Sequence, residues 1–195
     1  MSLRFLSLSG SQIDPVIDGL ATLRIRVFRD WPYLYDGDRD YERTYLRVYR
    51  DNRRAVVVGA FDGETLVGAS TGLPMADADA EFAQAFADSP HDVSQIFYCA
   101  ESVLLPDYRG QGAGRRFFEL REAHARAHGF GLSAFCSVMR PDDHPARPAA
   151  YTPLDAFWRK RGYAPLQGIA AQFSWRDVGQ QGDSLKTLQF WMKHL

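Results

Sequence analysis

The feature that most constrains the fold is a glycine-rich turn between an apolar strand pattern and an amphipathic helix pattern. Residues 96–105 have the pattern of a strand, and residues 106–116 (PDYRGQGAGRR) contain three glycines. Apolar side chains then recur at helical spacing over residues 112–128, and a second strand pattern covers residues 132–138. This succession predicts a strand–helix–strand unit whose strands are parallel and joined by a right-handed crossover.

The turn has the composition of a phosphate-binding site. Glycines at positions 110, 112 and 114 leave the backbone N–H groups free of obstruction by side chains. The first N–H groups of a helix lack internal partners, and the helix dipole adds partial positive charge there. Because Arg109, Arg115 and Arg116 add formal charge, the turn is suited to an anionic phosphate ligand.

Two common phosphate-binding motifs do not match this turn. A Walker loop requires Lys and then Ser or Thr after its last glycine, whereas this chain has Arg115 and Arg116. A dinucleotide-binding fingerprint requires a third glycine at position 115 or 117, where Arg115 and Phe117 stand. The pattern that remains is Arg109-x-x-Gly112-x-Gly114 after a strand.

This pattern resembles the acyl-CoA-binding motif of the GNAT superfamily of N-acetyltransferases, a strand followed by P-x-Y-R-G-x-G-x-G. Residues 157–163 (FWRKRGY) are similar to the end of the family's late helix. The resemblance implies one GNAT-like domain over residues 1–195 in the α/β (mixed α+β) class. Its sheet is expected to be mixed and mostly antiparallel, with a central parallel β-α-β unit that binds acyl-CoA. The matching motif positions are Pro106, Tyr108, Arg109, Gly110, Gly112 and Gly114.

The resemblance implies acetyl-CoA as co-substrate, bound where the strand before the turn separates from its parallel neighbour. Ser102, Val103 and Leu104 are then expected to hold the pantetheine arm, whose amides replace missing sheet partners. We expect no metal, because His124 and His128 stand four residues apart without a metal-binding pattern. Arg109 either contacts a phosphate or orders the turn. The residues expected at the pyrophosphate are Arg109, Gly110, Gln111, Gly112, Ala113, Gly114 and Arg115.

The implied reaction is direct attack of a primary amine on the thioester carbonyl, which transfers an acetyl or other short acyl group. Glu101 is the candidate base for the amine, and the alternative is that it forms an ion pair with an arginine. Many family members have a tyrosine where this chain has Trp158, and indole cannot protonate the departing thiolate. Tyr151 is the substitute candidate acid, and protonation by solvent is the alternative.

The acceptor, a small molecule or a peptide amine, is not identified by the sequence. Residues 31–36 (WPYLYD) are expected to wall its pocket, with Asp36 facing an ammonium, unless this loop only packs on the sheet. Arg140 and Arg147, in a proline-rich loop, either bind an acceptor carboxylate or are solvated. A GNAT-fold module that binds acyl-CoA without catalysis is the alternative function, favoured by Trp158. A phosphate binder that takes no pantetheine is a further alternative.

Composition limits the partners and the compartment. The 195 residues carry 23 basic and 24 acidic side chains, and this balance argues against general binding to nucleic acid or anionic membranes. The N-terminal residues lack a signal-peptide pattern, and the longest apolar run, residues 55–61, is too short to span a membrane. Because Cys99 and Cys136 lie in apolar stretches, we expect reduced core thiols and a cytoplasmic protein. A homodimer that pairs late strands is left open.

Helix and strand patterns account for the rest of the chain. Asp62 and Gly63 join two apolar runs and predict a hairpin. Asp14 is the expected N-cap of the first helix, and Glu122 and Arg126 are expected to form a solvated helix pair. The expected strands are residues 3–8, 55–61, 65–72, 169–175 and 185–192, and the expected helices are residues 15–28, 41–50, 154–161 and a surface helix or insertion over 75–88.

Overall fold

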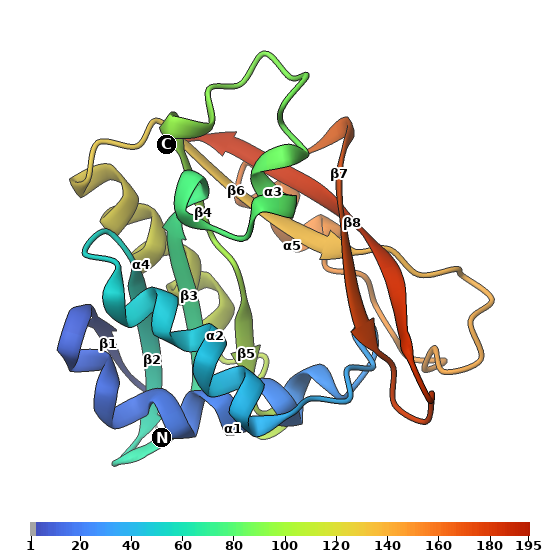
Figure 1. Ribbon diagram of the computed structural model, residues 1–195. Helices are drawn as coiled ribbons and strands as arrows, with labels where there is room; N and C mark the ends of the chain where they lie inside the picture. The colour runs from blue at the N-terminus through green and yellow to red at the C-terminus, as the bar shows by residue number, and fades with distance from the viewer. Residues whose placement is uncertain (1–2) are drawn as a thin grey trace.

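The computed structural model describes residues 3–195 as one open sheet flanked by helices (Figure 1). No helix among these residues is long and apolar enough to cross a membrane. The helices are α1 (Ile17–Phe28), α2 (Arg39–Asp51), α3 (Ala80–Gln84), α4 (Ala113–Ala127) and α5 (Asp155–Lys160). The strands are β1 (Arg4–Leu8), β2 (Val56–Asp62), β3 (Thr65–Pro74), β4 (Ile96–Tyr98), β5 (Ser102–Leu104), β6 (Leu132–Val138), β7 (Ala164–Arg176) and β8 (Asp183–His194).

The sheet has the mixed topology that the sequence predicts. Its eight strands run in the order β1-β2-β3-β4-β6-β8-β7, and β5 pairs with β3 beside this path. β4 and β6 are parallel, and the other strand pairs within residues 3–195 are antiparallel. Since α4 lies between β5 and β6 in the chain, the predicted parallel β-α-β unit is present. The mixed, mostly antiparallel fold class is therefore confirmed.

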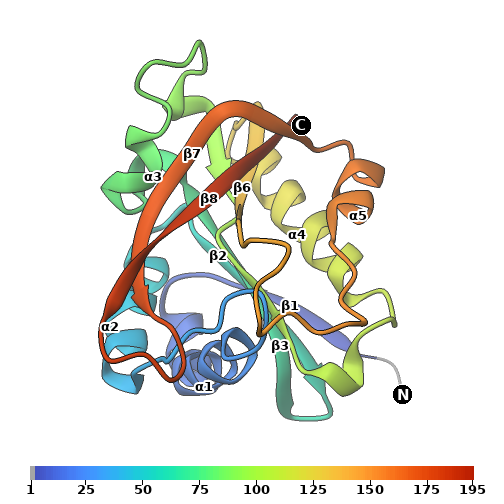
Figure 2. The ribbon, with the colours of Figure 1, turned by 90° about the vertical axis from the view of Figure 1, so that its right-hand side faces the viewer.

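Helices cover both faces of the sheet. Figure 2 shows α1, α2 and α3 on one side and α4 and α5 on the other. Side chains of β2 alternate between these two layers, because successive residues of a strand point to opposite faces. Val57 packs in the cluster on the α1 side, whereas Val56 and Val58 pack in the cluster on the α4 side. Burial on both faces explains why β2 is a continuous apolar run rather than an alternating one.

The prediction of one continuous strand over residues 96–105 is wrong, because a β-bulge divides this segment into two strands. Ala100 donates its N–H to the Thr71 carbonyl (3.1 Å), and the Thr71 N–H donates to the Glu101 carbonyl (3.0 Å). Two residues therefore oppose one residue of β3, which bends the strand and ends its pairing locally. The result is two short strands: β4 pairs with β6 and β3, and β5 pairs with β3 alone within the described chain.

The first helix begins differently from the prediction. A 3-10 turn covers Gly10–Val16 and includes Pro15, and the α-helix starts only at Ile17. Asp14 is not the N-cap; its side chain accepts a hydrogen bond from Arg50 Nε at 3.0 Å. Ser9 precedes the turn, and its N–H donates to the Gln12 side chain (3.1 Å). Proline favours this tighter start because it has no N–H to donate to a preceding turn.

Two segments expected at the surface are partly buried. Residues 75–88 contain the short helix α3, so the surface-helix alternative holds in part. Phe82 of α3 and Phe86 after it are nevertheless buried in the core, so this segment also forms a wall of the fold. Glu122 of α4 is also buried, and Lys193 Nζ donates to its carboxylate at 2.8 Å. Arg126 lies farther from that carboxylate, at 3.7 Å. The predicted pair of Glu122 with Arg126 is therefore present, but Glu122 is buried and also pairs with Lys193, so the pair is not a solvated one.

Candidate active site

The site is built around a gap in the sheet between β5 and β6. β4 and β6 pair over three residues each, and the Cys99 N–H donates to the Ala134 carbonyl at 2.7 Å. Beyond this point β5 turns to β3, while β6 continues beside β8. Alternate strand residues direct their peptide groups to opposite edges, and Glu101 and Leu105 bond to β3. The peptide groups of Ser102 and Leu104 are therefore directed to the open edge, whereas those of Val103 are directed to β3.

A buried arginine holds the bulge that opens this gap. Arg121 of α4 is 1% exposed, and its Nη1 donates to the carbonyls of Thr71 (3.1 Å) and Glu101 (2.9 Å). These carbonyls lie on the two strands that meet at the bulge, so one guanidinium fixes their relative position. Hydrogen bonds from charged donors to buried carbonyls are stronger than those between neutral groups. The sequence offered no signal for this role of Arg121 beyond a charged residue among apolar helix positions.

The glycine turn has the conformation that a phosphate cradle requires. Gly110 and Gly112 have φ values of +77° and +84°, which L side chains rarely adopt, and a Cβ at either would meet no atom within 4 Å. Gly112 is the N-cap of α4 and supplies no side-chain cap, so the first N–H groups of α4 stay available. The space and the unpaired donors fit a pyrophosphate group.

Neighbouring side chains order this turn. Arg109 Nε donates to the Leu104 carbonyl (3.2 Å), so Arg109 orders the turn in this structure. The Tyr108 hydroxyl donates to Asp62 (2.9 Å) and ties the turn to the β2–β3 hairpin. Arg115 and Arg116 are exposed and share one carboxylate, that of Glu119, at 3.2 and 3.4 Å. The start of α4 therefore keeps an excess of positive charge.

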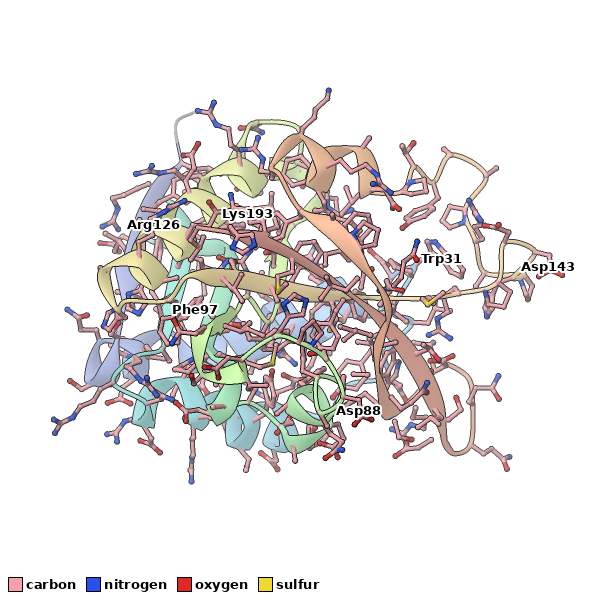
Figure 3. The ribbon with its side chains drawn as sticks, turned by 90° about the horizontal axis from the view of Figure 1, so that it is seen from above. Trp31, Asp88, Phe97, Arg126, Asp143 and Lys193 are labelled. Atoms are coloured by element: carbon pink, nitrogen blue, oxygen red, sulfur yellow. The ribbon has the colours of Figure 1, made fainter. Side chains whose placement is uncertain are left out.

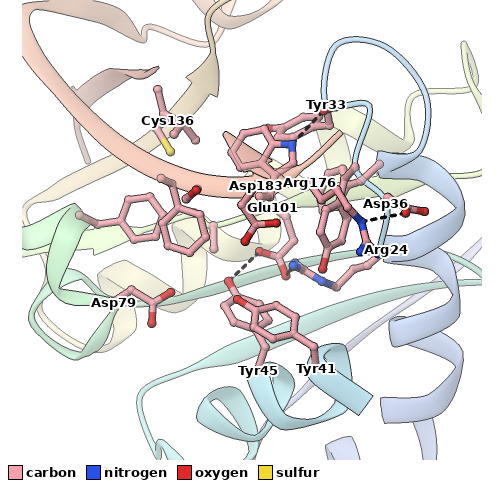
Figure 4. A pocket seen from close by; sticks show the side chains of 18 of the residues that line it. Arg24, Tyr33, Asp36, Tyr41, Tyr45, Asp79, Glu101, Cys136, Arg176 and Asp183 are labelled. Atoms are coloured by element: carbon pink, nitrogen blue, oxygen red, sulfur yellow. Dashed lines mark hydrogen bonds and ion pairs between the residues drawn. The ribbon is translucent and has the colours of Figure 1, made fainter. Parts of the chain in front are cut away.

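A cavity of about 360 Å³ lies on the other side of the gap, among α1, α2, α3, β7 and β8 (Figure 4). At its inner end it reaches Ala100, Glu101 and Cys136, which border the gap. The α4 helix, whose N-terminus carries the glycine turn, covers the opposite face of the sheet (Figure 2). Two ligands can thus approach the gap from opposite faces. The aromatic lining residues are Phe28, Tyr33, Tyr35, Tyr41, Tyr45, Phe82, Tyr98, Phe173 and Trp175.

Glu101 lies at the inner end of this cavity and is ion-paired. Its carboxylate contacts the Arg24 guanidinium and accepts hydrogen bonds from the Tyr45 (3.4 Å) and Tyr49 (3.5 Å) hydroxyls. Arg24 also pairs with the fully buried Glu42. Burial, and next the charge of Glu101, raises the pKa of both hydroxyls, so they remain protonated donors. Glu101 thus lines the cavity, as a base would have to, and it also forms the ion pair with an arginine, here Arg24, that was the alternative prediction.

Two further residues lie apart from this cavity wall: Tyr151, the candidate acid, and Trp158, which stands where many family members have a tyrosine. Tyr151 does not line the cavity; its ring packs edge-on against Trp31 with centroids 5.9 Å apart. Burial, and next the charge of Asp155, raises the pKa of Tyr151. Trp158 packs against Phe135 on the α4 side of the sheet, at 5.0 Å between centroids. Neither ring therefore lies beside Glu101.

The sequence did not single out Tyr98 or Arg24, which both line the cavity. Tyr98 lines the cavity, and its hydroxyl lies 3.1 Å from Cys136 Sγ. Burial raises the pKa of the Cys136 thiol to about 12, which keeps it protonated at neutral pH. A protonated thiol is a poor nucleophile, so the predicted core-filling role suits Cys136 better than covalent catalysis. Arg24 is likewise marked only as a charged residue within an apolar helical stripe.

Arg140 holds the loop at residues 31–36, which lines the outer part of the cavity, in place through hydrogen bonds. It donates to both carboxylate oxygens of Asp177 (2.8 and 2.9 Å) and to the carbonyls of Pro32 (2.9 Å) and Tyr33 (2.6 Å). Figure 3 shows the proline-rich loop projecting from the body past Trp31, with Asp143 at its far end. Both predicted alternatives for Arg140, a solvated side chain and a free carboxylate binder, are wrong, because its donors are occupied inside the protein.

Low pH should weaken the ion pair between Arg140 and Asp177, because Asp177 becomes protonated. Burial would raise the pKa of Asp177, but its hydrogen bonds with Arg140 and Lys186 outweigh burial and lower it. A carboxyl whose pKa is lowered by folding stabilises the protein fully above its unfolded value of about 3.9, and that stabilisation is lost as the pH falls through the folded value. We expect Asp177→Asn to lower the free energy of unfolding at pH 7 by about 1–3 kcal/mol.

Denaturant unfolding at several pH values checks this prediction. The loss of stability between about pH 4 and pH 2 should be smaller in Asp177→Asn than in the wild type. Asp142→Asn is the matched control, because the Asp142 side chain is 96% exposed. A steep acid limb of equal size in Asp177→Asn and the wild type would contradict the prediction.

The fold has counterparts among known proteins. The profile of the Acetyltransferase (GNAT) family matches residues 21–163, and the chain belongs to this family. Members of the family transfer acyl groups from CoA to amine acceptors. No curated protein gave a significant match to the chain. Within residues 3–195, no group of three or more His, Cys, Asp or Glu side chains is arranged to hold a metal ion.

Solved structures share the whole fold at low sequence identity. A protein proposed to be an acetyltransferase from Acinetobacter baylyi ADP1 has a TM-score of 0.67 and 14% identity, with 100% of this chain and 92% of that chain covered. The ribosomal-protein-alanine N-acetyltransferase of Brucella melitensis has a TM-score of 0.62 and 14% identity, with 100% of each chain covered. PaiA N-acetyltransferase of Thermoplasma acidophilum, solved with coenzyme A, has a TM-score of 0.56 and 12% identity, with 100% of each chain covered.

Proposed function

We propose that this protein is an acyl-CoA-dependent N-acetyltransferase that moves an acetyl or other short acyl group to a primary amine. One observation carries the proposal: the gap between β5 and β6 opens to an aromatic cavity on one face, and α4, with the glycine turn at its N-terminus, covers the other. Such a gap lets the thioester and the amine meet within the sheet.

The open edge and the turn supply the binding groups for acetyl-CoA. The peptide groups of Ser102 and Leu104 hold the pantetheine amides, and the buried Val103 side chain supports the strand from the core. The pyrophosphate binds residues 110–115, where the helix dipole and the neighbouring arginines favour negative charge. Arg109 supports this cradle through its bond to the Leu104 carbonyl.

In the proposed reaction, the amine nitrogen attacks the thioester carbonyl carbon, the C–N bond forms and the C–S bond breaks. The amine loses a proton and the CoA thiolate gains one. Glu101 accepts a hydrogen bond and then the proton from the amine, because it is the carboxylate at the inner end of the cavity. Water protonates the thiolate, since Tyr151 does not line the cavity and Trp158 has no titratable proton.

A second candidate function is an acyl-CoA-binding module without catalysis. Two observations favour it: Trp158 stands where many family members have a tyrosine, and Arg24 pairs with the Glu101 carboxylate. A carboxylate held in an ion pair is less free to accept a hydrogen bond from an amine. The two functions share the acyl-CoA site and differ in whether free thiol is released when an amine is present.

Calorimetric titration with acetyl-CoA, CoA and ATP tests the common part of both functions. We expect both CoA species to bind at least tenfold more tightly than ATP, because ATP lacks the pantetheine arm. Release of free thiol in the presence of an amine then distinguishes the enzyme from the module. If the wild-type protein binds neither CoA species, both functions are contradicted.

A further inference from the structure

Aromatic rings form most of the cavity's side walls. Phe82 of α3 and Phe173 of β7 stack on each other at 5.6 Å with an angle of 8° between their planes. Tyr33 and Trp175 lie 6.1 Å apart on the neighbouring wall. Aromatic pairs contribute stabilisation beyond the area that they bury, so these walls favour a flat aromatic ligand over a sugar or an extended polar chain.

The charges of the cavity favour a cation. Five carboxylates line it against two guanidinium groups, and both guanidinium groups already have carboxylate partners. Arg24 pairs with Glu101, and Arg176 pairs with Asp36 at 3.0 Å. The carboxylates therefore outnumber the cations, and rings beside them add cation–π attraction for an ammonium.

The same charges disfavour a ligand that carries a carboxylate. The charges of Arg24 and Arg176 are both compensated by carboxylate partners. A carboxylate on the ligand would therefore be repelled by the acidic side chains of the cavity. Arg140 and Arg147, in the adjacent loop, are also occupied, by Asp177 and Asp142 respectively. These four arginines are thus not poised to bind an α-carboxylate.

The size of the cavity limits the ligand further. Its volume of about 360 Å³ lies near the lower end of the range for small-molecule pockets. The buried side chains of Tyr98, Cys136 and Leu188 line its inner end beside the gap. A short arm that carries an amine can reach Glu101 there, while the aromatic body lies between the walls.

We propose that the acceptor is a compact arylalkylamine: a primary ammonium on a short alkyl arm, joined to an aromatic ring and without a carboxylate. This inference rests on the acetyltransferase function proposed above. The ring lies between Phe173 and Tyr33, and the amine lies at Glu101 beside the gap. An α-amino acid of the same skeleton is rejected by its carboxylate.

A matched pair of amines tests the proposal: 2-phenylethylamine and L-phenylalanine differ only by the carboxylate. We expect kcat/KM for 2-phenylethylamine, measured by thiol release from acetyl-CoA, to exceed that for phenylalanine by at least about 100-fold. Calorimetry with CoA on the same protein reports the cofactor site separately. 1,4-Diaminobutane and a lysine-containing peptide serve as further acceptors, and both should be poorer than 2-phenylethylamine.

Variants test whether the cavity wall recognises the ring. Phe173→Leu removes an aromatic pair, and we expect it to raise KM for 2-phenylethylamine about threefold to tenfold while CoA affinity stays unchanged. Phe5→Leu is the control, because Phe5 is a half-buried ring on β1, at the far edge of the sheet. It should leave both quantities unchanged.

The possible results distinguish failure of the acceptor inference from failure of the acetyltransferase function. If the protein binds CoA but uses phenylalanine, the diamine or the peptide as well as 2-phenylethylamine, the acceptor inference is overturned and the acetyltransferase function stands. CoA binding with no turnover of 2-phenylethylamine also overturns it. Failure to bind CoA removes the function on which the inference rests.

Discussion

Replacing Gly112 with tryptophan should weaken binding of CoA at least about 100-fold, which corresponds to about 2.7 kcal/mol. Gly112 has a φ of +84° at the start of α4, a conformation that costs an L residue about 1–2 kcal/mol. A Cβ there would meet no atom of the protein within 4 Å, so an indole would occupy the space in front of the first helix N–H groups. That space is where the phosphate is proposed to lie. Calorimetric titration with CoA measures the change.

Gly129 provides a matched control at the other end of the same helix. Its φ is +80°, and a Cβ there would likewise meet nothing within 4 Å. Gly129→Trp should therefore carry the same backbone strain and lower the thermal midpoint by a similar amount, with CoA affinity retained. Loss of CoA affinity in both variants would attribute the effect to strain, and normal affinity in Gly112→Trp would contradict the cradle.

The Glu101→Gln variant should lower the rate of acyl transfer at least about 100-fold while the Kd for CoA changes less than about threefold. Glutamine keeps the size of the side chain, but its amide cannot take a proton from the amine. It also loses the charge that pairs with Arg24, which then retains only Glu42. Steady-state thiol release gives the rate, and calorimetry gives the affinity.

Glu122→Gln is the control for this change. Glu122 is also a buried, ion-paired glutamate, but Lys193 is its partner on the α4 side, away from the cavity. Glu122→Gln should destabilise the fold and leave the rate per folded molecule unchanged. A pH–rate profile of Glu101→Gln with the same shape as that of the wild type would remove Glu101 as the base. It would then leave Glu101 as a partner of Arg24 only.

The parts of the fold that the sequence predicted correctly depend on neighbours in the chain. A strand ending, a run of glycines and a helix start are local events, so the turn at residues 106–116 and the parallel β4–α4–β6 unit were predictable. The hairpin at Asp62 and Gly63 is local in the same way. The bulge at Ala100 and Glu101 was not predictable, because it exists only relative to Thr71 on β3.

The cavity is formed by contacts that the sequence alone does not specify. Arg24 and Glu101 are 77 positions apart, and nothing in the sequence selects Arg24 from among the other arginines as the partner of Glu101. Tyr33, Tyr35 and Asp36, from the segment predicted to wall the acceptor pocket, line the cavity, and Asp36 pairs with Arg176. That the acceptor binds in this cavity stays a prediction. The role of Arg140 was missed because its acceptors, Asp177 and the Pro32 and Tyr33 carbonyls, come from distant segments.

The proposed acyl-CoA site and the proposed acceptor cavity therefore depend on different kinds of contact. The glycine turn follows from residue types at fixed spacing, because positive φ angles and unpaired helix N–H groups arise within a dozen residues. The cavity arises only when three helices and the late strands pack together, since its rings and charges come from segments across most of the chain. Burial and long-range contacts, which a linear pattern does not encode residue by residue, decide which side chains line this cavity.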